Sequence, residues 1–298
     1  MCHLPGGCTH TDLPDWTPCG EGMVCDGSGA CKTVWESKGM AFVPAGTFWM
    51  GCNKAKDSQC DDDEKPQHKV TLSAYYMDIT ETTGAQWMAC VEAGGCTAPD
   101  GDRYEFSCNW DTTNGQAKRG RELHPVNCVT WIQAQQYCVW RGAGFDLPTE
   151  AQWEMAARGS CEENGSAAGD PACAKAMRTY PWGEAKATCD YAVMDNGNGT
   201  GCGKEGTLAV GSIPAGDSPY GLHDMAGNVW EWTRDWFAFY TAADQTDPVG
   251  PGSGSQLIVR GGSFIWWLAQ DMRTCVRSYA DSGDANGTVG LRCSRSFP

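Results

Sequence analysis

Apolar residues recur at helical spacing in three short segments of this chain, and each segment opens with the same pattern. Thr83-Gly84-Ala85-Gln86, Thr130-Trp131-Ile132-Gln133 and Thr149-Glu150-Ala151-Gln152 each place a glutamine three residues after a threonine. The threonine hydroxyl accepts a hydrogen bond from the amide three residues on, and the glutamine side chain reaches back to the threonine amide. The pattern predicts three capped helices, the first of which ends near Val91.

Short runs of β-branched and aromatic residues predict strands around these helices. Phe42-Val43 and Thr47-Phe48-Trp49-Met50 flank Pro44-Ala45-Gly46, which is typical of a hairpin. Further strand patterns cover residues 70–77, 208–210, 229–232 and 257–260. The 38 glycines imply many turns, so the pattern predicts an α+β protein with short elements.

Composition narrows the classes of protein and partner. The 298 residues suit one large domain or two smaller ones, and no run approaches the roughly 20 apolar residues of a membrane helix. A formal net charge of -15 argues against a nucleic-acid partner, because phosphates require a basic surface. The same charge favours cations but identifies no partner.

Eighteen cysteines, with no Cys-x-x-Cys pair, are the strongest compositional signal. Closely spaced cysteines predict local disulfides for the pairs Cys52/Cys60, Cys90/Cys96 and Cys189/Cys202. Such a framework indicates an oxidising compartment, so we expect a secreted, periplasmic or cell-surface protein. Cys2 follows Met1 directly, and a signal peptide is therefore expected to have been removed.

Residues 1–36 form a cysteine-rich N-terminal module, and residues 37–298 form the main domain. Five cysteines in the module are an odd number, so at least one is expected to pair outside it. The module is either a small adhesive or spacer unit or a stapled tail on the main domain, because so few aliphatic residues cannot build a core. Cys2 is either a disulfide partner or the acylated cysteine of a lipoprotein.

Residues 221–232 combine glycine, tryptophan and carboxylates in one stretch. Asp224 and Glu231 supply the oxygen ligands that calcium prefers, with small residues between them. On a strand, Trp230 and Trp232 would share one face and Glu231 would occupy the other. From these residues alone, an irregular loop that leads into a buried strand is the simpler interpretation.

The wider set of motifs resembles the formylglycine-generating-enzyme, or sulfatase-modifying-factor, family over roughly residues 40 to 294. The matching motifs, in family order, are Phe42-Val43-Pro44-Ala45-Gly46-Thr47-Phe48-Trp49-Met50-Gly51, His124-Pro125-Val126-Asn127, Leu147-Pro148-Thr149-Glu150-Ala151-Gln152-Trp153-Glu154, Tyr180-Pro181-Trp182-Gly183, Gly227-Asn228-Val229-Trp230-Glu231-Trp232, Arg260-Gly261-Gly262-Ser263-Phe264 and Gly290-Leu291-Arg292. The resemblance implies an α+β fold related to C-type lectins, with sparse secondary structure and stabilisation by disulfides and calcium. It also implies a Cys138–Cys293 disulfide.

The resemblance implies one calcium ion, held by the side chains of Asp224 and Glu231 and the carbonyls of Gly227 and Val229. A second ion would use Asp190 and the carbonyl of Tyr191. Its later carboxylate is not matched, because that region holds Cys202 and Lys204. A Cys189–Cys202 bridge is the alternative to this second ion.

The chain departs from the family at the site of chemistry. In the family's oxidases, two cysteines after the Gly-Gly-Ser-aromatic motif bind copper(I) as thiolates and oxidise a substrate cysteine to formylglycine. Here the first position falls on Trp266 and the second near Ala269 or Gln270, while Cys275 lies beyond both. None of these supplies a two-thiolate site, so we expect neither bound copper nor formylglycine synthesis.

The resemblance also implies a ligand-binding groove, to which Ser263, Trp230, Trp266, Trp267 and Arg277 would contribute. Aromatic side chains provide large, rigid contact area for a peptide or glycan. Alternatively, one tryptophan of the adjacent pair packs inward and the other covers the domain.

Two classes of function follow from these patterns. The first is an extracytoplasmic, calcium-binding protein that acts as a binding or structural module, with a peptide or glycan ligand or with self-association. The second is a metal-dependent oxidoreductase of the same superfamily that acts on a peptide or small molecule.

Overall fold

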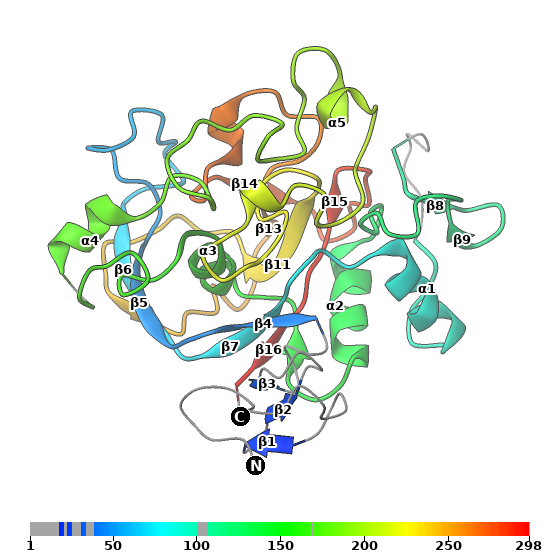
Figure 1. Ribbon diagram of the computed structural model, residues 1–298, viewed down its shortest axis with the longest axis horizontal. Coiled ribbons are helices and arrows are strands. Elements are labelled where there is room, and N and C mark those ends of the chain that lie inside the picture. Colours follow the sequence, from blue (N-terminus) through cyan, green and yellow to red (C-terminus); the bar gives the residue numbers. More distant parts are fainter. Residues whose placement is uncertain are drawn as a thin grey trace.

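The computed structural model describes residues 39–99, 107–168 and 170–297, together with the backbone of three short strands nearer the N-terminus (Figure 1). The predicted boundary between residues 36 and 37 lies outside the described residues. Cys2 and Cys8 also lie outside them, so the pairing of the N-terminal cysteines stays a prediction.

The helices are short and are joined by long irregular segments. They are α1 (Gly84–Glu92), α2 (Trp131–Trp140), α3 (Glu150–Arg158), α4 (Pro171–Ala176), the turn α5 (Thr200–Gly203), and the 3-10 turns η2 (Pro214–Gly216) and η3 (Ala269–Met272). The predicted capping boxes at Thr83, Thr130 and Thr149 are confirmed, because each threonine and the glutamine three residues later cap each other's backbone amides.

The strands are equally short. They are β1 (Pro18–Gly20), β2 (Met23–Cys25), β3 (Cys31–Thr33), β4 (Met40–Val43), β5 (Gly46–Met50), β6 (His68–Leu72), β7 (Tyr75–Asp78), β8 (Trp110–Asp111), β9 (Gln116–Ala117), β10 (Phe145–Asp146), β11 (Trp230–Trp236), β12 (Gln245–Thr246), β13 (Leu257–Arg260), β14 (Arg277–Ala280), β15 (Val289–Gly290) and β16 (Ser294–Ser296).

These strands form several small sheets. Their orders are β1-β2-β3, β10-β16-β7-β4, β14-β13-β11-β15, β12-β6-β5 and β8-β9. Helix α3 lies between two of them, because it packs against β5 and β6 on one side and β11 and β13 on the other (Figure 1). Its Trp153 is fully buried, and through these contacts α3 links the two sheets.

Three strand predictions are wrong, each because pairing depends on distant residues. Residues 42–43 and 47–50 form no hairpin, since β4 pairs with β7 while β5 pairs with β6. The predicted strand over residues 70–77 is two strands, β6 and β7, which lie in different sheets. Residues 208–210 form no strand, although the amide of Val210 donates to the carbonyl of Leu123.

Six disulfides tie the irregular segments together in the described part of the chain. They are Cys52–Cys60, Cys90–Cys96, Cys108–Cys128, Cys138–Cys293, Cys161–Cys173 and Cys189–Cys202. All four pairs expected from the sequence are among them. The Cys138–Cys293 bond joins α2 to the C-terminal segment across a separation of 155 residues.

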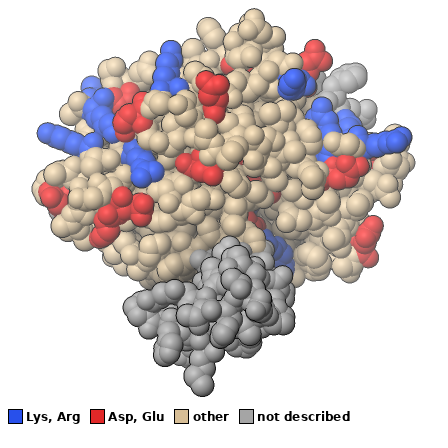
Figure 2. Space-filling view, viewed as in Figure 1, with Lys and Arg blue, Asp and Glu red and all other residues tan. Residues whose placement is uncertain are grey.

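The surface carries charges of both signs. On the face shown in Figure 2, acidic and basic side chains are interspersed, and neither sign forms a continuous patch. None of the described helices has the length and apolar composition needed to cross a bilayer.

Candidate functional site

Residues 221–232 lead into β11, the strand that β13 and β15 flank on either side. Asp224, Gly227 and Asn228 all have positive φ angles, so the backbone turns sharply before the strand. A Cβ atom on Gly227 would lie 2.4 Å from the carbonyl oxygen of Val193, which explains the glycine at this position. Trp230, Glu231 and Trp232 are all buried, so both faces of the strand are covered.

Glu231 is engaged by two side chains in the centre of the protein. Arg292 donates to both of its carboxylate oxygens, from Nε to Oε2 and from Nη2 to Oε1, each over 2.7 Å. The indole Nε1 of Trp153 also donates to Oε2 over 2.7 Å. This bidentate pair is fully buried on both sides.

Two further carboxylates lie close to this ion pair. Glu81 is fully buried and accepts hydrogen bonds from the side-chain amide of Asn228 and the backbone amide of Val229. Burial, reinforced by the charges of Asp224 and Glu231, raises the pKa of Glu81 well above its usual range. Burial also raises the pKa of Asp224. The charges of Glu81, Asp224 and Glu231 therefore influence one another in a buried environment, and Arg292 offsets one of them.

Of the two carboxylates expected to bind calcium, Asp224 has more capacity left for a cation than Glu231. The available donors are oxygens, as calcium requires. Within the described residues, Asp224 receives one hydrogen bond, from the amide of Gly211 to Oδ2, which leaves Oδ1 for a cation. Both oxygens of Glu231 already accept hydrogen bonds, so a calcium ion there would share that carboxylate with Arg292.

The residues expected at a second ion lie in a different environment. Asp190 is exposed and accepts a hydrogen bond from the hydroxyl of Thr188. The carbonyl oxygen of Tyr191 lies against Gly216, where a Cβ atom would come within 1.8 Å of it. The neighbouring Cys189–Cys202 disulfide already fixes this segment.

Four of the five expected groove residues are close together in sequence or in space. Ser263 is fully buried, and its hydroxyl has no hydrogen-bond partner within the described residues. Trp230 is buried and forms a T-shaped contact with Trp266, with ring centroids 6.4 Å apart. Trp266 and Trp267 are 41% and 68% exposed, so neither of these adjacent tryptophans is buried in the core.

Exposure continues on both sides of this tryptophan pair. Ile265 and Leu268 are also exposed, so four consecutive large apolar side chains reach the surface. The backbone beneath them is held in place, because the amide of Asp195 donates to the carbonyl of Trp266 and the amide of Trp266 donates to that of Ser263. We call residues 265–268 the aromatic loop.

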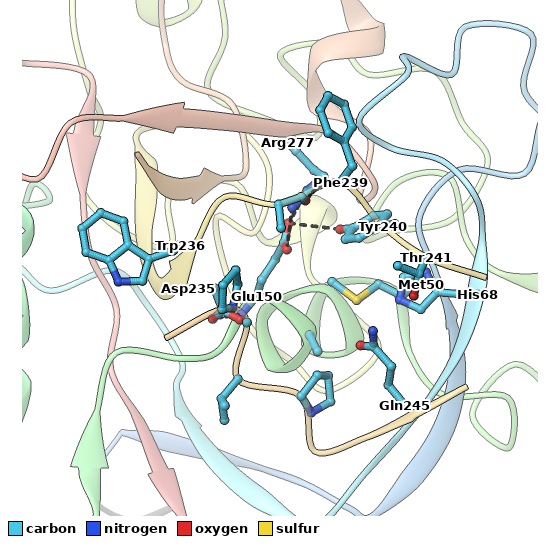
Figure 3. A pocket seen from close by; sticks show the side chains of 16 residues that line it. Met50, His68, Glu150, Asp235, Trp236, Phe239, Tyr240, Thr241, Gln245 and Arg277 are labelled. Carbon is cyan, nitrogen blue, oxygen red and sulfur yellow. Dashed lines mark hydrogen bonds and ion pairs between the residues drawn. The ribbon is translucent and has the colours of Figure 1, made fainter. Parts of the chain in front are cut away.

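Arg277, the fifth expected groove residue, lines a separate cavity of about 370 Å³ whose walls include none of the other four (Figure 3). It forms a bidentate ion pair with Glu150, at 2.6 Å from Nε and 3.0 Å from Nη2. The Tyr240 hydroxyl donates to the same carboxylate, and the guanidinium lies 4.0 Å from the centre of the Tyr240 ring. Arg277 is therefore held in place by protein groups.

Glu150 also affects the pKa of a second carboxylate in this cavity, that of Asp235. Although burial acts to raise the pKa of Glu150, the charges of Arg277 and Arg260 outweigh burial and lower it. Asp235 accepts a hydrogen bond from the Glu150 amide over 2.8 Å. Burial and the charge of Glu150 raise the pKa of Asp235 to about 7. Asp235 can thus change its charge near neutral pH.

Sequence reasoning missed these buried carboxylates. Around Glu150 and Glu154 the sequence predicts only a capped helix and a family motif, yet both side chains form buried ion pairs with Arg260. The available signal was Arg260 itself, which ends the otherwise apolar run Leu257-Ile258-Val259. A charge inside such a strand implies a buried partner.

Comparison with known proteins agrees with the fold and the motifs. The family model described as sulfatase-modifying factor enzyme 1-like domain matches residues 29–297. A formylglycine-generating enzyme of Streptomyces coelicolor is 31% identical, over 87% of this chain and 90% of its own length. A serine/threonine-protein kinase pkn1 of Chlamydia pneumoniae is 33% identical over 87% of this chain, which spans 38% of that kinase.

A solved structure extends the agreement to the fold. The structure of PvdO from Pseudomonas aeruginosa has a TM-score of 0.65 and 23% identity, and the match covers 87% of this chain and 94% of PvdO. The expected α+β fold of the formylglycine-generating family is thereby confirmed. Because the family model matches residues 29–297, which is most of the chain, the chain belongs to the sulfatase-modifying factor enzyme 1-like domain family.

Proposed function

We propose that this chain is an extracytoplasmic, calcium-stabilised binding protein of its family, and that the aromatic loop binds apolar segments of a polypeptide. The observation that carries the proposal is the run of four exposed apolar residues that begins at Ile265. Trp266 stands where the family resemblance puts the first copper-binding cysteine. The proposed binding surface therefore occupies the position at which the family's oxidases carry a reactive cysteine.

The chemistry of the loop favours a peptide over a glycan. Sugars stack on aromatic faces, whereas Ile265 and Leu268 offer aliphatic surface that suits apolar side chains. The loop backbone is held by hydrogen bonds to Asp195 and Ser263, so binding requires little ordering of the loop. Rigid aromatic residues of this kind dominate binding energy at protein interfaces.

The disulfides support the extracytoplasmic part of the proposal. Six disulfides in the described residues are typical of an oxidising compartment. Calcium is supported by the oxygen donor that Asp224 offers and by the raised pKa values of Glu81 and Asp224, because a bound cation would offset the cost of burying their charged forms.

The binding function is tested with an array of short peptides rich in aliphatic and aromatic residues. Replacing both Trp266 and Trp267 with alanine should weaken binding by about tenfold or more. Trp140→Ala is the matched control, because Trp140 on α2 is 41% exposed, the same as Trp266. Equal losses in the two variants, or none in either, would count against the aromatic loop.

The expected loss of copper-dependent formylglycine synthesis is tested separately. The purified protein is incubated with copper(I), oxygen and a cysteine-containing peptide, and the peptide mass is followed. We expect the cysteine to remain unchanged. Conversion of that cysteine to formylglycine would overturn the proposal that the chain has lost this activity.

A further inference from the structure

Two cysteines of the loop between β5 and β6 lie near a third cysteine, Cys275, close to the C-terminal end of the chain. Cys52 and Cys60 form a disulfide, and Cys275 is buried and forms no disulfide with any cysteine whose side chain the structure describes. The Sγ atoms of Cys52 and Cys275 and a carboxylate oxygen of Asp57 all lie within 4.8 Å of one another. Because the sulfurs of a disulfide are not thiolate ligands, this grouping favours thiol–disulfide exchange over metal binding.

Arg273 connects the free thiol to the disulfide. Its Nη1 lies 3.3 Å from Sγ of Cys275 and 3.5 Å from Sγ of Cys52. The same guanidinium pairs with Glu64 and Asp57, so its position is fixed. A positive charge beside the sulfurs stabilises the thiolate that exchange requires.

A proton acceptor also lies within reach of the thiol. The Cys275 Sγ donates to Oε2 of Glu64 over 3.8 Å, and burial raises the pKa of that carboxyl. Burial also raises the pKa of the Cys275 thiol to about 12, so the thiol is protonated at rest. A cavity of about 20 Å³, roughly one water molecule in size, borders both Cys52 and Cys275.

We propose that Cys52, Cys60 and Cys275 form a thiol–disulfide exchange site. The Cys275 thiol gives its proton to Glu64, and the thiolate attacks Sγ of Cys52. A Cys52–Cys275 bond forms, the Cys52–Cys60 bond breaks, and Cys60 leaves as a thiolate that takes up a proton. The number of disulfides is unchanged, so no oxidant or reductant is consumed.

Exchange moves the free thiol from the core toward the surface. Cys275 is 3% exposed, whereas Cys60 is half-buried between the exposed residues Gln59 and Asp61. A thiol at Cys60 can react with low-molecular-weight disulfides or with a disulfide of another protein, which Cys275 cannot reach. This site is independent of the aromatic loop and adds a covalent activity to the proposed binding function.

The test is alkylation of the native protein with N-ethylmaleimide, with no added thiol, followed by digestion and mass spectrometry. We expect alkylated Cys60 together with a Cys52–Cys275 cross-linked peptide. Replacing Cys275 with alanine should slow Cys60 alkylation by about tenfold or more, because no internal thiol remains to release it. The Cys189–Cys202 bond, which is also half-buried, serves as the internal control and should stay unlabelled.

A second variant keeps the proposal testable if Cys275→Ala fails to fold. In Cys60→Ser, the thiols of Cys52 and Cys275 are both free and should join in a disulfide when the protein is kept in an oxidising buffer. Absence of that bond, alkylation of Cys275 in place of Cys60 in the wild type, or Cys60 alkylation that does not depend on Cys275 would each overturn the proposal.

Discussion

Arg292 and Glu231 form a bidentate ion pair at the centre of the protein, and neither side chain has any exposed surface. Arg292 directly precedes Cys293, the last cysteine of the chain. Glu231 lies about 60 residues earlier, in the segment of residues 221–232. Arg292 also donates to the carbonyls of Asp78 and His223. The pair therefore joins the end of β7, the segment before β11 and the C-terminal segment.

Removing one member of this pair should destabilise the fold strongly. Arg292→Met leaves Glu231 as an uncompensated buried charge, which typically costs about 3 to 5 kcal/mol. Arg234→Met is the control, because the side chain of Arg234 on β11 is 47% exposed and its ion pair among the described residues is a longer contact with Asp146, at 3.7 Å. That change should alter the free energy of unfolding by about 1 kcal/mol or less. Similar losses in the two variants, measured by urea unfolding, would contradict this role for Arg292.

After bound metal has been removed with a chelator, adding calcium should raise the melting temperature of the wild-type protein. Asp224→Asn keeps an oxygen ligand and should retain a reduced shift, whereas Asp224→Ala should abolish it. Asp190→Ala, at the second expected ion, should leave the shift in place. The comparison uses the calcium-dependent change in each variant, so a general loss of stability does not affect it. An undiminished shift in Asp224→Ala would exclude Asp224 as a ligand.

Helix positions were predictable because their signals are local. The threonine and glutamine that cap α1, α2 and α3 lie within four residues of each other, and nothing distant is needed to recognise them. Strand pairing was less predictable, because β4 and β5 are neighbours in sequence but pair with β7 and β6 respectively. Short turn signals do not determine such non-local pairing.

The candidate site was predictable only in part for the same reason. The sequence singled out Asp224 and Glu231 but gave no sign of Glu81, because charged residues are usually exposed. Glu150 was similarly hidden, since its partners Arg260 and Arg277 follow more than 100 residues later. Buried ion pairs of this kind become visible only when the fold brings the partners together.

The Cys138–Cys293 disulfide should contribute strongly to stability because it closes the longest loop among the described disulfides. Chain-entropy arguments give about 4 to 5 kcal/mol for closing a loop of this order. Replacing both cysteines with alanine should lower the free energy of unfolding by that amount. Replacing Cys90 and Cys96, which are six residues apart, should cost less. Equal costs for the two pairs in urea unfolding would argue against the entropic account.

Asp235 should make stability fall as the pH rises toward neutrality. Its pKa in the folded protein is raised to about 7, while an unfolded aspartate titrates near 4, so the folded state binds this proton more tightly. The stabilisation is full below pH ~4 and is lost as the pH rises through about 7. Asp235→Asn removes this titration, and its side-chain carbonyl can still accept the hydrogen bond from the Glu150 amide.

Between pH 4 and pH 8, the wild type should therefore lose up to about 4 kcal/mol more unfolding free energy than Asp235→Asn does. Comparing the change with pH cancels any constant packing cost of the substitution. Glu92→Gln, which removes an exposed carboxylate from α1, controls for the loss of one charge. Because burial also raises the pKa of Glu81, the variant should retain a weaker slope of the same sign. A variant whose slope matches that of the wild type would mean that Asp235 is ionised throughout this range.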